Sequence, residues 1–156
     1  MVYSIIDKNK SLLKIPRGLF DEIDIYNRDE IEEFVKIVIV RILRERKIKG
    51  IVFLDIYIDL FYGMIIEIEN RSWDDIDDKI DVKIVFHIDS SFLYEIDYFD
   101  IKELDFKEHT IYYYNNKFYL EINHDIDDKL FCYLLEAREI IYKDLSIIRE
   151  GIVINI

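Results

Sequence analysis

The stretch that decides the fold is HTIYYYNNKFYLEIN, residues 109–123. An Asn-Asn pair at 115–116 separates two runs of alternating side chains, and asparagine tolerates the positive φ angles of a two-residue hairpin loop. With that loop, strand pairing places the following residues opposite each other on one face: Tyr113 and Phe118, and Ile111 and Leu120. The sequence therefore predicts a β-hairpin with one apolar face.

The other face of this predicted hairpin carries tyrosines. On it, Tyr112 lies opposite Tyr119, and Tyr114 and Glu121 extend the same row. In one interpretation a neighbouring helix covers the rings, because cross-strand aromatic pairs commonly stabilise sheets. In the other, the rings bind a protein partner, because tyrosine is enriched at binding hot spots. The second interpretation predicts partner contacts at Tyr112, Tyr114, Tyr119 and Glu121.

The composition is that of a folded chain with excess negative charge. Its 156 residues are 51% hydrophobic and 15% aromatic, enough for one domain or two small ones. The formal net charge is −12, so we expect neither nucleic-acid binding through phosphate contacts nor attachment to acidic membranes. A single cysteine and an N-terminus without the pattern of a secretory signal predict a cytoplasmic protein.

The first half of the chain is predicted to have β-α-β-β order. Asn27 begins a capping box, and apolar residues follow with helical periodicity as far as Ile42. Residues 51–69 then alternate on either side of Gly63, which permits a turn between two strands. We therefore predict a subdomain over residues 1–72 with a well-buried helix.

An acidic stretch, NRSWDDIDDK at 70–79, is the candidate boundary between the two halves. After it, an alternating segment at 82–88 predicts a strand, and residues 152–156 predict another. Together with the hairpin at 109–123, these strands predict a second subdomain over residues 80–156.

The second half is also expected to contain a helix. Aspartates before residue 129 can cap it, and its apolar stripe runs from Leu130 to Tyr142, whereas residues 90–104 fit helix and strand patterns equally well. The two halves predict an α+β fold with mainly antiparallel sheets and two main helices, as two subdomains or as one continuous domain.

Three segments in the second half of the sequence carry a resemblance to a protein family. They are the hairpin IYYYNNKFYL at 111–120, Val85-Phe86 leading through Asp89 to Phe92, and Leu134-Leu135-Glu136 followed by IIREG at 147–151. On these segments, the second half resembles the C-terminal domain of MecA-type adaptor proteins, which deliver substrates to the ClpC unfoldase of Gram-positive bacteria. The resemblance implies that the C-terminal half docks on the unfoldase while the N-terminal half captures a substrate protein.

No other pattern predicts catalysis or metal binding. The histidines are scattered, and HDIDD at 124–128 lacks the glycine and the ligand spacing of a calcium loop. Cys132 lies among acidic side chains, which disfavour a nucleophilic thiolate. The glycines form no phosphate-binding loop. We therefore predict no enzyme activity, no cofactor and no bound metal.

Two charged segments are further candidates for protein contacts. The basic run from Arg41 to Lys49 suits a helix C-terminus, and the alternative is docking of an acidic protein. Trp73 stands among the aspartates of residues 74–78, so this segment is either a solvated connector or a partner-binding strip anchored by Trp73.

These observations predict a non-enzymatic protein-protein adaptor, which would act by raising the local concentration of a substrate at an unfoldase. One alternative is an acidic inhibitor or immunity protein that occupies a basic surface of its partner. Another is a small enzyme whose site assembles from dispersed Asp, Glu and His. A deep pocket that holds carboxylates with strongly shifted pKa values would indicate such a site.

Overall fold

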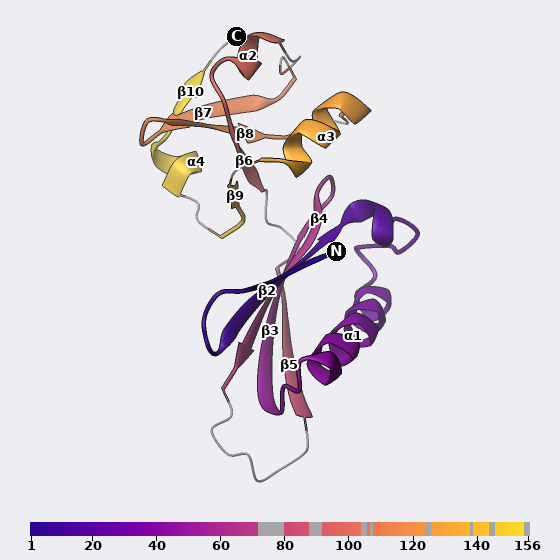
Figure 1. Ribbon diagram of the computed structural model, residues 1–156. Helices are drawn as coiled ribbons and strands as arrows, with labels where there is room; N and C mark the ends of the chain where they lie inside the picture. Colours follow the sequence, from indigo (N-terminus) through magenta and orange to yellow (C-terminus); the bar gives the residue numbers. More distant parts are fainter. Residues whose placement is uncertain are drawn as a thin grey trace. The chain divides into compact units, whose positions relative to one another are not determined.

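The computed structural model describes residues 1–71, 80–87, 92–103, 106, 108–123, 126–137, 139–143 and 146–154. The chain divides into two compact units, Met1–Asp89 and Ser90–Ile156. Each unit is built on its own five-stranded sheet with helices beside it (Figure 1). The predicted α+β fold with mainly antiparallel sheets is confirmed. Within the described ranges, no helix is both long enough and apolar enough to cross a membrane.

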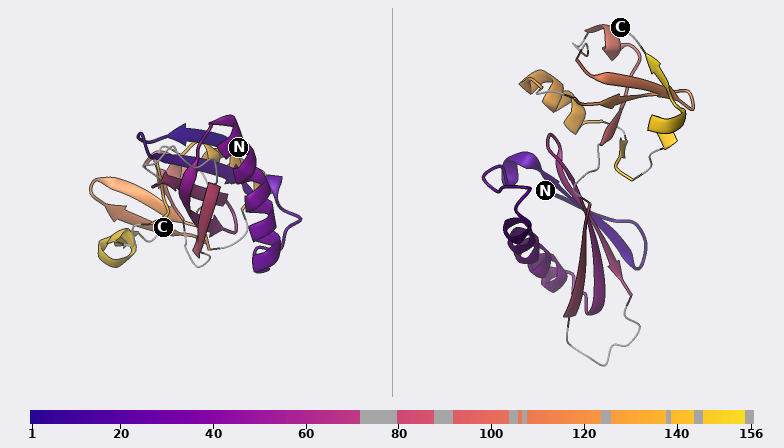
Figure 2. Two further views of the ribbon diagram at one scale, coloured as in Figure 1. Left: turned by 90° about the horizontal axis from the view of Figure 1, so that it is seen from below. Right: turned by 180° about the vertical axis from the view of Figure 1, so that it is seen from behind.

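The N-terminal unit packs one long helix, α1 (Arg28–Glu45), on one face of its sheet (Figure 2). A short 3-10 helix, η1 (Arg17–Leu19), precedes it. The strands are, in sheet order, β1 (Val2–Ile5), β2 (Lys10–Pro16), β4 (Gly63–Asn70), β3 (Gly50–Asp59) and β5 (Ile80–His87).

The predicted helix forms where its cap and apolar stripe place it. The side chain of Asn27 accepts a hydrogen bond from the backbone N of Glu30 at 3.4 Å, which satisfies one free N–H of the first turn. The apolar stripe of α1 then packs on the alternate, inward-facing residues of β2, β3 and β4. Val35 and Ile56, both 0% exposed, lie at the centre of this core.

Strand β5 corrects the expected boundary between the halves. The sequence places the strand at 82–88 in the second subdomain, whereas β5 pairs with β3 in the N-terminal sheet, Val52 opposite Val82. This pairing is parallel, while the other neighbours in the sheet are antiparallel. The division at Asp89 therefore falls later than the predicted boundary at 72–80.

The described residues of the C-terminal unit form an antiparallel sheet and three short helices. Its strands are, in sheet order, β10 (Ile152–Ile154), β7 (Thr110–Tyr114), β8 (Lys117–Glu121), β6 (Leu93–Ile96) and β9 (Ile140–Ile141). Its helices are α2 (Asp100–Glu103), α3 (Asp128–Leu135) and α4 (Ser146–Glu150).

The helix predicted through Tyr142 is shorter in the structure. Asp127 caps α3 by accepting from the backbone N of Leu130 at 2.8 Å, as the sequence suggests, but the helix ends at Leu135. Ile140 and Ile141 instead pair with β6 as an edge strand, because β-branched residues fit a strand better than a helix end. The ambiguous stretch at 90–104 contains both β6 and α2.

Candidate protein-binding site

The β7–β8 hairpin has the loop and the register that its sequence predicts. Asn115 and Asn116 have φ angles of 49° and 62°, the backbone of a two-residue turn that matches the twist of the strands. The paired residues are Tyr113 with Phe118 and Tyr112 with Tyr119. Each residue of the hairpin therefore lies on the face that the sequence predicts. Whether a face can bind a partner depends on which other elements cover it.

The face carrying Tyr112 and Tyr119 is not an open surface. These rings are 7% and 5% exposed, and they form a cluster with Leu93 of β6 and Ile147 of α4. Tyr114 packs on the same cluster, half-buried, and its hydroxyl donates to Glu150 of α4 at 3.5 Å. The structure thus places three predicted contact residues against α4, where a partner cannot reach the two buried ones without displacing the helix.

The remaining predicted contact residues do not extend this face into a binding surface. Glu121 is half-buried and accepts a hydrogen bond from the hydroxyl of Tyr112 at 3.4 Å. This contact and burial together raise the pKa of Tyr112, burial being the larger cause. Trp73 lies outside the described residues.

The opposite face of the hairpin begins a row of aromatic rings that are half-buried on the hairpin, at Tyr113 and Phe118, and exposed beyond it, at Tyr98 and Phe99. Ring centroids lie 5.1 Å apart for Tyr113 and Phe118, 5.7 Å for Phe118 and Tyr98, and 6.0 Å for Tyr98 and Phe99. Ile152 of β10 pairs with Tyr113 in register and extends the row. We call these five residues the aromatic patch; Phe99 is 80% exposed, Ile152 63% and Tyr98 52%.

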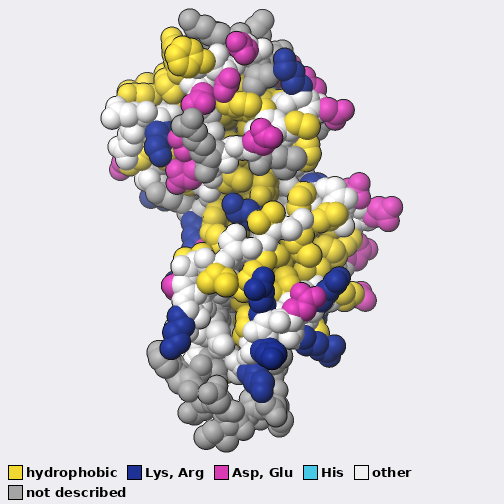
Figure 3. Space-filling view, in the orientation of Figure 1, with side chains coloured by type: hydrophobic (Ala, Val, Ile, Leu, Met, Phe, Trp, Pro, Cys, Tyr) yellow, Lys and Arg dark blue, Asp and Glu magenta, His cyan; other side chains and the backbone are white. Residues whose placement is uncertain are grey.

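The aromatic patch combines apolar area with acidic neighbours. Asp97 precedes Tyr98, and Asp100 follows Phe99 at the start of α2. Figure 3 shows hydrophobic side chains interspersed with Asp and Glu on the surface of the C-terminal unit. Exposed aromatic side chains gathered in one place, rimmed by polar groups, are typical of a protein-binding surface.

Sequence reasoning missed Tyr98 and Phe99 because their segment fitted two patterns. The one available signal was DYFD at 97–100, two aromatic residues between aspartates: the helical pattern includes Phe99 and the strand pattern includes Tyr98, but neither includes both. Only the end of β6 at Ile96 shows that both rings leave the sheet on a turn and become exposed.

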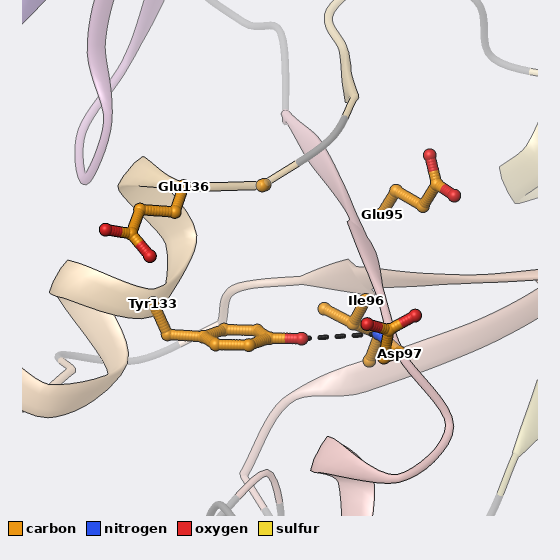
Figure 4. A pocket seen from close by; sticks show the side chains of 6 residues that line it. Glu95, Ile96, Asp97, Tyr133 and Glu136 are labelled. Carbon is orange, nitrogen blue, oxygen red and sulfur yellow. Dashed lines mark hydrogen bonds between the residues drawn. The ribbon is translucent and has the colours of Figure 1, made fainter.

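Tyr133 of α3 holds the turn that carries these two rings. Its hydroxyl donates to Asp100 Oδ2 at 2.7 Å and accepts from the backbone N of Asp97 at 3.2 Å. Figure 4 shows Tyr133 reaching from α3 to Asp97 across a pocket of about 120 Å³, while Glu95 points away from it. One hydroxyl thus fixes both ends of the segment between Asp97 and Asp100.

The surroundings of Tyr133 keep its hydroxyl protonated. Burial and the hydrogen bond to Asp100 raise its pKa from 10.0 to about 12. Because the folded pKa exceeds the unfolded one, the stabilisation is fully present below about pH 10 and is lost as the pH rises towards about 12. The Tyr133 side chain is only partly buried, so solvent screening reduces the effect to about 1–2 kcal/mol.

Replacing Tyr133 with phenylalanine should therefore lower the free energy of unfolding by about 1–2 kcal/mol at pH 7. The difference from the wild type should shrink as the pH is raised from about 10 to about 12, because the wild-type hydroxyl ionises and can no longer donate. Urea unfolding followed by circular dichroism at several pH values measures this. Tyr26→Phe, on a ring 71% exposed in the N-terminal unit, is the matched control. A difference that stays constant with pH would contradict the assigned role.

The histidines and the cysteine considered in the sequence have the following positions. His87 of β5 lies 3.1 Å from Asp55 of β3 and stacks on Tyr57, so it links the edge strand to its neighbour. Cys132 is exposed, and His124 lies outside the described residues. Over those residues, no group of three or more His, Cys, Asp or Glu side chains could hold a metal ion.

The aromatic patch is thus the feature of the C-terminal unit that best fits a binding role. Comparisons of the whole chain with models of protein families, with curated proteins and with solved structures give no match.

Proposed function

We propose that the protein is a non-enzymatic protein-protein adaptor whose C-terminal unit docks on its partner through the aromatic patch. The observation that carries this proposal is the exposure of Phe99, 80%, at the end of a continuous row of aromatic rings. Leaving such a ring in water forgoes about 1.5–3 kcal/mol of burial, which a partner with a matching apolar pocket recovers.

The partner we propose is a ClpC-type unfoldase, to which the adaptor delivers a substrate protein held by the N-terminal unit. The resemblance to MecA-type adaptors supports this choice, through the β7–β8 hairpin and IIREG at 147–151. Val85-Phe86, which also contributes to the resemblance, belongs to the N-terminal sheet. The adaptor would regulate proteolysis by tethering alone, because bringing a substrate to the unfoldase raises its effective concentration.

Binding of the purified protein to a purified ClpC-type unfoldase tests this proposal. Phe99→Ser should weaken binding by about 30-fold, because truncating an aromatic hot spot costs 2 kcal/mol or more. Tyr26→Ser, which removes a similarly exposed ring from the N-terminal unit, should bind as the wild type does. Isothermal titration calorimetry gives both affinities, and circular dichroism confirms that the variants fold.

Two outcomes would count against the adaptor proposal. If the wild type does not bind the unfoldase at micromolar concentrations, the proposed partner is wrong. If it binds but Phe99→Ser and Tyr26→Ser bind equally well, the aromatic patch is not the docking surface.

The second candidate is an acidic inhibitor or immunity protein that covers a basic surface of its partner. The net charge of −12 favours it, because a strong negative field attracts a basic partner over long distances. The dependence of partner affinity on salt distinguishes the two candidates. A large loss of affinity between about 0.05 M and about 0.5 M salt indicates binding through charge. Affinity that changes little indicates binding through the apolar area of the patch.

A further inference from the structure

A second pocket lies within the N-terminal unit, between the β1–β2 hairpin and the C-terminal end of α1. Its volume is about 320 Å³, more than twice that of the pocket beside Tyr133. Its apolar lining includes Tyr3, Ile48 and Ile68, and its basic lining residues are Lys8, Lys10 and Arg46. We call it the basic pocket.

The loop of the β1–β2 hairpin is fixed by Asp7. The carboxylate Oδ1 of Asp7 accepts from the backbone N of Asn9 at 2.8 Å and from that of Lys10 at 2.9 Å. This arrangement holds Lys8 and Lys10 at the rim. Asp7 is also the one carboxylate among the residues that line the pocket, and its negative charge offsets part of the positive charge there.

The end of α1 brings Arg46 and Ile48 to the other side of the pocket. Lys47 has a φ of 54°, and the backbone N of Ile48 donates to the carbonyl of Leu43 at 2.9 Å, a helix-ending arrangement that satisfies free carbonyls. The guanidinium of Arg46 lies 4.6 Å from the centre of the Tyr3 ring. The macrodipole adds about half a negative charge at this helix end, which the three basic side chains outweigh.

The basic side chains that line the pocket outnumber the acidic ones, three to one. Within the described part of the chain, Lys8, Lys10 and Arg46 form no ion pair. Glu69, in register with Lys10, feels the charge of that lysine but pairs directly with Arg71 at 3.1 Å. Figure 3 shows Lys and Arg side chains gathered on this part of the N-terminal unit. An excess of positive charge around a partly apolar pocket is unexpected in a chain of net charge −12.

We infer that the basic pocket binds an acidic peptide segment of a partner protein. A large apolar side chain of the segment enters the pocket against Tyr3, Ile48 and Ile68, and flanking carboxylates contact Lys8, Lys10 and Arg46. The volume of about 320 Å³ holds one aromatic side chain with part of its backbone. A nucleic acid fits less well, because phosphate binding needs a longer track of cations and the rest of the chain repels a polyanion.

This inference does not depend on the adaptor proposal, because the basic pocket belongs to the N-terminal unit and its ligand is measured without an unfoldase. If the protein is an adaptor, the acidic segment would belong to the substrate. Failure of one proposal leaves the other intact, since the aromatic patch and the basic pocket share no residue.

The test uses the full chain and a labelled pentapeptide with tryptophan between two pairs of glutamates, followed by fluorescence anisotropy. We expect binding that weakens by about tenfold in Arg46→Gln and again in Lys8→Gln. Arg41→Gln is the matched control, since it removes the same charge from an exposed position of α1 where Arg41 pairs with Glu45. This control should bind as the wild type does. Replacing the tryptophan of the probe with alanine should also weaken binding by about tenfold.

Several results would overturn the inference. No binding of the glutamate probe, or equal binding of a probe with lysines in place of the glutamates, would show that the pocket does not select acidic segments. Equal loss in Arg41→Gln and Arg46→Gln would show a general effect of charge. Competition by inorganic phosphate at the same concentration as the probe would show a site for small anions instead of a peptide.

Discussion

Replacing Tyr112 with alanine is expected to lower the free energy of unfolding of the C-terminal unit by about 3–5 kcal/mol. The ring is 7% exposed and packs with Tyr119 and Ile147, so its removal leaves a cavity between the sheet and α4. Most domains have only about 5–15 kcal/mol of stability in total. The loss should therefore appear as a large shift of the urea midpoint measured by circular dichroism.

Phe99→Ala is the matched control for this variant. It also truncates an aromatic side chain of the C-terminal unit, but that ring is 80% exposed, so the midpoint should change little. The two variants are expected to have opposite phenotypes: Tyr112→Ala loses stability, and Phe99→Ala loses partner binding. A Tyr112→Ala protein that unfolds like the wild type but binds its partner poorly would restore the predicted contact role of Tyr112.

Replacing Gly63 with alanine should destabilise the N-terminal unit by about 3 kcal/mol or more, and failure to fold is within expectation. Gly63 begins β4 with a φ of 124°, a conformation that residues with a side chain rarely adopt. A Cβ at this position would clash with the carbonyl oxygen of Ile15 and would lie 2.5 Å from the backbone N of Arg17. These are backbone atoms at the end of β2, which cannot move aside without breaking the pairing of β2 with β4.

Gly18→Ala is the control that separates this clash from a general effect of replacing glycine. A Cβ at Gly18 meets no atom within 4 Å, so the substitution should change the free energy of unfolding by less than about 1 kcal/mol. Urea unfolding of the two variants makes the comparison. Similar midpoints for Gly63→Ala and the wild type would mean that the end of β2 moves more easily than its hydrogen bonds suggest.

The sequence predicted correctly those features that are encoded locally. The loop at 115–116, the register of Tyr113 with Phe118 and the cap at Asn27 each depend on residues a few positions apart. Alternation likewise identified the strand around Val82, because its pattern is the same in any sheet.

The features that the sequence did not predict depend on contacts between distant residues. The alternation of apolar and polar residues identifies a strand but not the strand with which it pairs. The parallel pairing of β5 with β3 could therefore not be inferred. The same holds for the tyrosine face, since Tyr112 and Ile147 are far apart in sequence and only the folded chain shows that α4 covers the ring. For this reason the candidate binding site is the aromatic patch, on the face of the hairpin opposite to the predicted contact residues.

The cover that α4 provides has a consequence during synthesis. The β7–β8 hairpin emerges from the ribosome well before Ile147, because residues 122–146 must be translated in between. At about 5–20 residues per second, Tyr112 and Tyr119 stay uncovered for a few seconds on the nascent chain. During that interval they are available to chaperones or to other nascent chains, so the hairpin is the segment of the C-terminal unit where we expect misassembly to begin.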